Sequence, residues 1–92
     1  MRELISTPKF DCAYARFTKR DQSRRKCVDE TLARLKANPQ DSRLKTHRLS
    51  GHLAGQFAAY CGYDCRVLFE WHRGSEREVI ILITVGTHDI VY

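Results

Sequence analysis

Residues Tyr63–Gly86, with the sequence YDCRVLFEWHRGSEREVIILITVG, have the clearest strand pattern of the chain. Apolar and polar residues alternate over Tyr63–His72, which predicts a strand with one buried face. Arg73–Glu76 has the composition of a hairpin turn. Beyond it, Glu78–Val85 is apolar on both faces, which predicts a central strand that Gly86 ends. The stretch therefore predicts two neighbouring antiparallel strands inside a sheet.

The alternation also predicts which way the side chains of the first strand point. The expected core face carries Cys65, Val67, Phe69 and Trp71. The expected outer face carries Asp64, Arg66, Leu68 and Glu70. If helices cover the first face, the second stays uncovered, and this charged surface is where we expect the chemistry.

The residues before this hairpin have helical spacing. Phe10, Tyr14 and Phe17 follow at i, i+4 and i+7, which predicts an amphipathic helix. Thr7 is its expected N-cap, and Pro8 is its first helical residue. A second helix is expected from the cap Asp21 to Asn38-Pro39, with the apolar stripe Val28, Leu32 and Leu35.

Two shorter segments complete the expected fold. Arg2–Thr7 is predicted to be a first strand, and Gln56–Cys61 a strand that ends at a turn at Gly62. The order strand, helix, helix and then mostly antiparallel strands predicts an α+β fold. We expect one domain spanning 1–92, with a two-helix hairpin on one face of a small sheet of about four to five strands.

The charge of the 92 residues is uneven, with 16 Lys and Arg against 11 Asp and Glu and a net charge of +5. The excess lies in the first two-thirds of the chain, whereas residues 62–92 carry more acidic than basic groups. A dense cationic run comprises Lys19, Arg20, Arg24, Arg25 and Lys26. Such a run attracts phosphates and acidic protein segments, and it is equally typical of a solvated helix face.

Several classes of protein are excluded by composition and spacing. The longest apolar run, Val79–Val85, is far shorter than the roughly 20 residues of a membrane helix. No signal peptide is visible at the N-terminus, so we expect a cytoplasmic protein without a membrane role. The four cysteines, Cys12, Cys27, Cys61 and Cys65, are therefore expected to be reduced and to act as small hydrophobic residues. Neither cysteines nor histidines have the spacing of a metal site, and we expect no metal or cofactor.

Three motifs together resemble those of the RelE superfamily of toxins, and of its YafQ-like branch in particular. His47–Gly55, HRLSGHLAG, resembles the H-x-L-x-G-x-x-x-G stretch of these toxins. Tyr63–Phe69, YDCRVLF, resembles the strand that follows it, and Gly86–Tyr92, GTHDIVY, resembles their C-terminal ending. The motifs occur in the family's order, after the expected helical hairpin. Tyr60 and Cys65 depart from the pattern, which has histidine and tryptophan there.

The resemblance implies a compact fold similar to that of microbial ribonucleases and metal-free cleavage of mRNA in the ribosomal A site. By position it implies five catalytic residues: His47, Asp64, Arg66, His88 and Tyr92. Lys45, Arg48 and Tyr60 are expected to contact RNA, Tyr60 by stacking on a base. His88 suits the general acid, Arg66 suits the phosphate, and either Asp64 or His47 suits the base.

The resemblance also implies partners. We expect a cognate antitoxin and the ribosome to contact the cationic run, and operator DNA to be bound only by the toxin–antitoxin complex. Two other functions fit the same sequence: a ParE-like inhibitor of DNA gyrase, and a nucleic-acid-binding relative without catalytic activity. The resemblance favours the nuclease because His47 and His88 are present.

Overall fold

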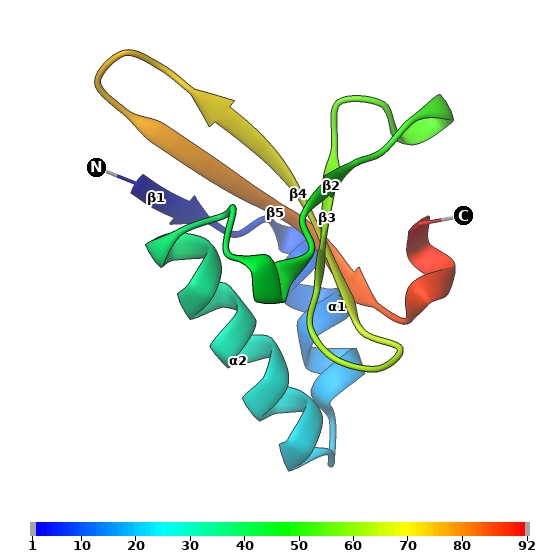
Figure 1. The fold of residues 1–92 in the computed structure, drawn as a ribbon. Helices are drawn as coiled ribbons and strands as arrows, with labels where there is room; N and C mark the ends of the chain where they lie inside the picture. Colours follow the sequence, from blue (N-terminus) through cyan, green and yellow to red (C-terminus); the bar gives the residue numbers. More distant parts are fainter. Residues whose placement is uncertain (1, 92) are drawn as a thin grey trace.

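The structure is a computed structural model, and it describes residues 2–91 (Figure 1). Two helices and a five-stranded sheet make up the fold, which confirms the expected α+β class. The order along the chain is β1 (Arg2–Ile5), α1 (Pro8–Thr18), α2 (Gln22–Ala37), β2 (His47–Arg48), β3 (Phe57–Tyr60), β4 (Arg66–Arg73) and β5 (Glu78–Gly86). Short 3-10 turns lie at η1 (Ser42–Leu44), η2 (Gly51–Leu53) and η3 (His88–Val91).

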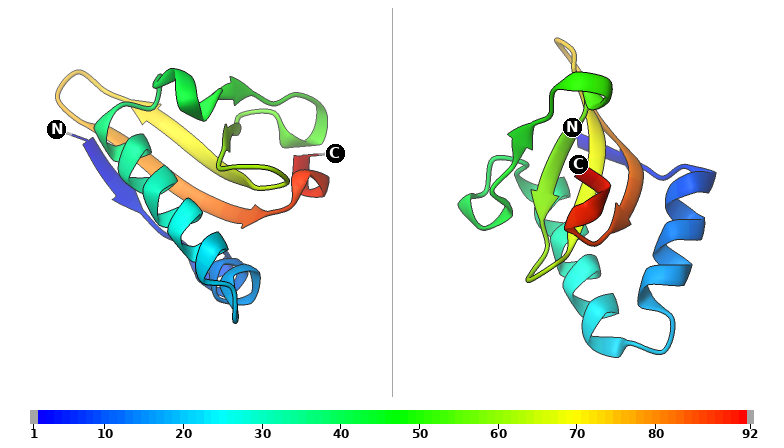
Figure 2. Two further views of the ribbon diagram at one scale, coloured as in Figure 1. Left: turned by 60° about the horizontal axis from the view of Figure 1, so that its bottom comes forward. Right: turned by 90° about the vertical axis from the view of Figure 1, so that its right-hand side faces the viewer.

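The strands lie in the order β1-β5-β4-β3-β2. β1 is parallel to β5, and the other three pairs are antiparallel. Both strands of the β4–β5 hairpin therefore have a neighbour on each side, and β5 is a central strand, as its two-sided apolar sequence predicts. Because β1 and β5 are parallel neighbours, the chain between them has to cross one face of the sheet, and α1 and α2 begin this crossing (Figure 2).

Each helix begins at the expected cap. The Thr7 hydroxyl accepts a hydrogen bond from the backbone N–H of Phe10 at 3.1 Å and donates one to the carbonyl of Leu82 at 2.8 Å. Thr7 thus caps α1 and attaches its start to β5. Asp21 caps α2 by accepting from the N–H of Arg24 at 3.0 Å. Neither described helix is long and apolar enough to cross a membrane.

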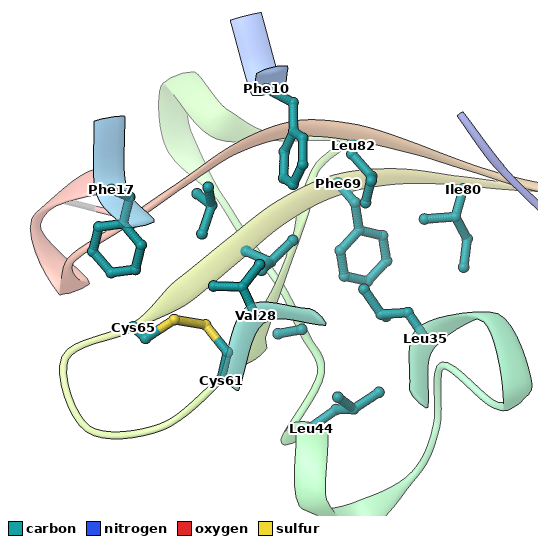
Figure 3. Close-up of a cluster of buried hydrophobic side chains, with 13 residues drawn as sticks. Phe10, Phe17, Val28, Leu35, Leu44, Cys61, Cys65, Phe69, Ile80 and Leu82 are labelled. Carbon is teal, nitrogen blue, oxygen red and sulfur yellow. A yellow bond between two sulfur atoms is a disulfide. The ribbon is translucent and has the colours of Figure 1, made fainter. Parts of the chain in front are cut away.

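The helices bury their apolar stripes against one face of the sheet (Figure 3). Phe10 and Phe17 of α1 and Val28 and Leu35 of α2 are buried there. They meet the inward side chains of the sheet, which are Ala59, Val67, Phe69, Ile80, Leu82 and Val85. Trp71 packs at the edge of this core, and its indole N–H donates to Glu78 at 2.5 Å.

The opposite face of the sheet is less open than expected. Ala58 and Leu68 pair across β3 and β4 and are both buried, although they lie outside the helix-covered core. The turn η3 contacts β4 and β5, so that it covers part of this face. A Cβ atom at Gly86 would lie only 3.0 Å from Ile90 Cγ2, which shows how closely the chain returns. The chain after β5 therefore brings His88 over the end of the sheet.

The expectation that all four cysteines are reduced core residues is wrong. Cys61 and Cys65 form a disulfide with a Cα–Cα distance of 5.1 Å, and both are buried (Figure 3). The three residues between them form the β3–β4 loop, which brings the two cysteines opposite one another, within the range that a disulfide spans. Cys12 of α1 and Cys27 of α2 are free and exposed.

Candidate active site

Asp64 and His88 form the centre of the candidate site. One carboxylate oxygen of Asp64, Oδ1, lies 2.5 Å from Nδ1 of His88 and accepts a hydrogen bond from the His88 backbone N–H at 3.0 Å. Nε2 of the same imidazole lies 3.3 Å from the carboxylate of Asp89. The two contacts with Asp64, one to the backbone N–H and one to the imidazole, fix both the position and the ring orientation of His88. Two residues on either side of the whole β4–β5 hairpin thus meet in one ion pair.

The backbone around Asp64 explains how its carboxylate reaches His88. Gly62 has φ 117° and Asp64 has φ 56°, and both values lie in the left-handed region. The N–H of Cys65 donates to the carbonyl of Gly62 at 3.2 Å, and the N–H of Cys61 donates to the carbonyl of Cys65 at 3.1 Å. Glycine and aspartate are among the residues that tolerate this conformation best. The tight loop turns Asp64 toward η3.

The pair shifts the pKa values of both partners in the directions that favour an ion pair. The hydrogen bond that the His88 imidazole donates to Asp64 raises the pKa of His88 above its ordinary 6.5, and the charge of Asp89 adds to this effect. The hydrogen bonds from His88 lower the pKa of Asp64 below its ordinary 3.8, with a small contribution from the charge of Arg24. The imidazole is therefore held in its protonated form to a higher pH than a free histidine.

Arg66 and Tyr60 lie beside this pair. The guanidinium of Arg66 donates to the carbonyls of Cys65 at 2.8 Å and Gly62 at 3.3 Å, and it lies 4.9 Å from the centre of the Tyr60 ring. The ammonium of Lys45 lies at the same distance of 4.9 Å from that ring. Two cations therefore flank Tyr60.

These groups surround a shallow pocket of about 220 Å³. Its lining residues are Tyr60, Tyr63, Asp64, Arg66 and His88. An imidazolium, a carboxylate, a guanidinium and two phenol rings in so small a space can bind a phosphate and an adjacent aromatic base. Among residues 2–91, no group of three or more histidine, cysteine or acidic side chains could hold a metal ion.

His47 and Arg48 lie outside this pocket. His47 pairs with Ala58, two residues before Tyr60 on β3, so it lies on the same sheet face but about 7 Å further along the strand. Its Nδ1 lies 3.1 Å from the carbonyl of Lys45. Both residues line a separate hollow, where Arg48 stacks 5.5 Å from the ring of Phe57. Tyr92 lies outside the described residues.

The cationic run is exposed, as expected for a contact surface or a solvated helix face. Lys19 and Arg20 lie in the connection between α1 and α2, and the other three residues lie on the first turns of α2. Arg24 stacks 4.3 Å from the ring of Phe17 and lines a pocket beside the β3–β4 loop. One residue of the run, Arg24, therefore reaches the surroundings of the candidate site.

Tyr63 is a pocket residue that the sequence patterns do not single out. The alternation places it at the start of a strand, whereas it lies at the tip of the β3–β4 loop with a relative exposure of 96%. The sequence feature that indicates a loop at Tyr63 is its position between Gly62 and Asp64, two residues suited to a tight loop.

The fold is similar to that of solved structures of YafQ and YoeB/ParE toxins. YafQ from E. coli strain BL21(DE3) superposes with a TM-score of 0.79 over 100% of this chain and 99% of its own, at 14% sequence identity. A YoeB/ParE toxin from Agrobacterium tumefaciens gives a TM-score of 0.77 over 94% of this chain and 98% of its own, at 16% identity. The toxin–antitoxin complex DinJ-YafQ from E. coli also matches, with a TM-score of 0.77 over 99% of this chain and 97% of the matched chain, at 14% identity. No family model and no curated protein matches the sequence.

Proposed function

We propose that this protein is the toxin of a type II toxin–antitoxin system and that it cleaves mRNA in the ribosomal A site. The observation that carries the proposal is the Asp64–His88 ion pair beside the Arg66 guanidinium. It places an imidazole whose pKa is raised by its hydrogen bond to Asp64 beside a guanidinium that can bind phosphate. The similarity to YafQ and YoeB/ParE structures supports the same class of protein.

The proposed reaction needs no metal. The ribose 2′-oxygen attacks phosphorus, and the bond from phosphorus to the 5′-oxygen breaks. A base takes the 2′-hydroxyl proton, and His88 gives a proton to the departing 5′-oxygen. The products are a 2′,3′-cyclic phosphate and a free 5′-hydroxyl. Arg66 stabilises the negative charge that develops on the nonbridging oxygens. Each proton transfer by a positioned group contributes about 10²–10⁴-fold to the rate.

The base is either Asp64 or His47. Asp64 lies in the pocket, but its Oδ1 already binds His88, and a lowered pKa makes it a weak base. If His47 is the base, Asp64 acts as a positioning residue for the His88 imidazole. His47 lies outside the pocket, about 7 Å further along the sheet than Tyr60, so as the base it would act on a nucleotide that extends beyond the pocket along β3. Loss of the acidic limb of the pH–rate profile in His47→Gln, with the basic limb kept, would assign the base to His47.

A toxin of this class requires an antitoxin and acts where ribosomes are, in the cytoplasm. Solved structures of similar toxins include the DinJ-YafQ and YoeB-YefM toxin-antitoxin complexes. We propose that a cognate antitoxin places an acidic segment on the exposed cationic run of α2, and that only this complex binds operator DNA. The charges of Arg24, Arg25 and Lys26, all exposed, support this location.

Inhibition of DNA gyrase, as by ParE, is a second candidate function. It is favoured by the match to a YoeB/ParE toxin and by the departures at Tyr60 and Cys65. The departures at Tyr60 and Cys65 also fit a third candidate, a nucleic-acid-binding relative without catalytic activity. Inhibition of supercoiling by the purified protein, with cellular mRNA intact, would establish the gyrase function.

The test is induced expression followed by growth measurement and primer extension on cellular mRNA. Wild type should arrest growth and produce new 5′ ends within coding regions. His88→Gln and Asp64→Asn should do neither, because each breaks the ion pair. His72→Gln is the matched control, since His72 pairs with Glu70 at the other end of β4. Equal toxicity and cleavage by all four proteins would overturn the proposal.

A further inference from the structure

Tyr63 has no structural role within the described chain that accounts for an aromatic side chain. Its relative exposure of 96% leaves almost the whole phenol in solvent, whereas the other large aromatic residues of the described chain are buried or half-buried. It follows Gly62 and precedes Asp64, so its neighbour belongs to the candidate catalytic pair. An exposed ring beside a catalytic carboxylate is suited to contact a substrate rather than the core.

The backbone that carries this ring is anchored on both sides. The Cys61–Cys65 disulfide closes the loop at its base, and the hydrogen bond from the Cys65 N–H to the Gly62 carbonyl crosses it. The residue after Tyr63, Asp64, is held in place because its carboxylate accepts hydrogen bonds from His88. Because the loop is already ordered, a ligand that stacks on Tyr63 loses little affinity to ordering of the loop.

Tyr63 also lies between two pockets. It lines the pocket of Asp64, Arg66 and His88, and it lines the pocket of about 140 Å³ that contains Phe17 and Arg24. Tyr63 thus shares one pocket with Arg66 and the other with Arg24, so a strand that binds both pockets would have Tyr63 beside it. Cations that bind phosphates and an aromatic ring that stacks on a base are the groups with which proteins bind single-stranded RNA.

We propose that Tyr63 is a substrate-binding residue that stacks on the base adjacent to the scissile phosphate, while Arg24 binds the next phosphate. The inference rests on the proposed function for the identity of the ligand, single-stranded RNA, and it adds a contact on which base preference depends. Stacking holds the base in place and so aligns the neighbouring phosphate with His88.

The experiment measures binding apart from cleavage. The probe is a labelled single-stranded hexanucleotide of 2′-deoxyribose, which keeps bases and phosphates but lacks the attacking hydroxyl. Fluorescence anisotropy at low salt compares wild type with Tyr63→Ala, Tyr63→Phe and Tyr63→Trp. Base–aromatic stacking predicts binding weakened roughly 5- to 150-fold in the alanine variant and retained in the other two. Arg24→Gln should weaken binding and also reduce its salt dependence.

A second arm removes one base at a time from the hexanucleotide. If Tyr63 stacks on a base, one abasic position should weaken binding by wild type but have no further effect on Tyr63→Ala. Unchanged binding by the alanine variant, additive losses at every position, or no binding by wild type would overturn the inference. Weaker co-purification of Tyr63→Ala with the antitoxin, with unchanged oligonucleotide binding, would place Tyr63 in the protein interface instead. These outcomes are independent of whether His88→Gln abolishes cleavage.

Discussion

The pairing of Asp64 with His88 shows what single residues contribute to the candidate site and how far they could be predicted. Both residues are identifiable from motifs in the sequence, at positions 24 residues apart. Their direct contact cannot be predicted from the motifs, because it depends on the left-handed φ of Asp64 and on the return of η3 over the sheet. The same motifs predict His47 as a third catalytic residue beside Asp64 and His88. Strand pairing instead places it opposite Ala58, two residues before the pocket residue Tyr60.

The ion pair leads to a prediction about pH. In the folded protein the raised pKa of His88 adds stability that is complete below 6.5 and is lost as pH rises through the folded value. The lowered pKa of Asp64 adds stability that is complete above 3.8 and is lost as pH falls through its folded value. The pair is therefore formed between these two folded-state values.

Asp64→Asn should lower the pKa of His88, because it removes the largest cause of the increase. NMR titration of the imidazole measures this shift directly, with His72 as an internal reference. The basic limb of the pH–rate profile should move to lower pH in the same variant, if any activity remains. An unchanged His88 titration would contradict the geometry of the pair.

At the scale of elements, the helices and the central hairpin could be predicted because their patterns are local. Helical spacing and capping residues locate α1 and α2, and alternation locates β4. The disulfide could not be predicted from the same kind of pattern. A spacing of three residues fits no common cysteine motif, and the expected cytoplasmic location argues for thiols. Only the hairpin register brings Cys61 and Cys65 together.

Thr7 is the residue on which the start of α1 depends. Thr7→Ala removes the cap of α1 and the hydrogen bond to the Leu82 carbonyl, and it should lower the free energy of unfolding by about 1–3 kcal/mol. Urea denaturation followed by circular dichroism measures the change. Thr7→Ser keeps the hydroxyl and should lose less than half as much. Equal losses in the two variants would show that the hydroxyl is not the cause.

The disulfide gives a second prediction for an element, the β3–β4 loop. Closing so short a loop restricts the unfolded chain only modestly, so reduction should lower the free energy of unfolding by about 2 kcal/mol. The measurement is urea denaturation with and without dithiothreitol. The double variant Cys61→Ala/Cys65→Ala should be insensitive to the reductant. The control Cys12→Ala/Cys27→Ala removes the two free thiols and should respond as wild type does; a control without that response would contradict the pairing.

For the whole molecule, the structure shows which parts of the chain supply the charges of the candidate site. The C-terminal third has more acidic than basic groups, yet it contributes Asp64, Arg66 and His88 to the pocket. The surrounding cations come from elsewhere in the chain, with Lys45 near β2 and Arg24 on α2. Net basicity therefore does not supply the proposed catalytic groups, and we propose that it instead holds the protein on ribosomal RNA or on an acidic antitoxin segment.

The proposed role of the Asp64–His88 pair is to cleave RNA by attack of the ribose 2′-hydroxyl on the scissile phosphate. The most direct measurement incubates the purified protein with mRNA-programmed ribosomes and identifies the new ends by mass spectrometry. Wild type should release fragments ending in a 2′,3′-cyclic phosphate, with 5′-hydroxyl ends on the other fragments. His88→Gln should reduce the rate by about 10²–10⁴-fold, the contribution of one general acid. Cleavage by His88→Gln at the wild-type rate, or products that carry a 5′-phosphate, would contradict the account.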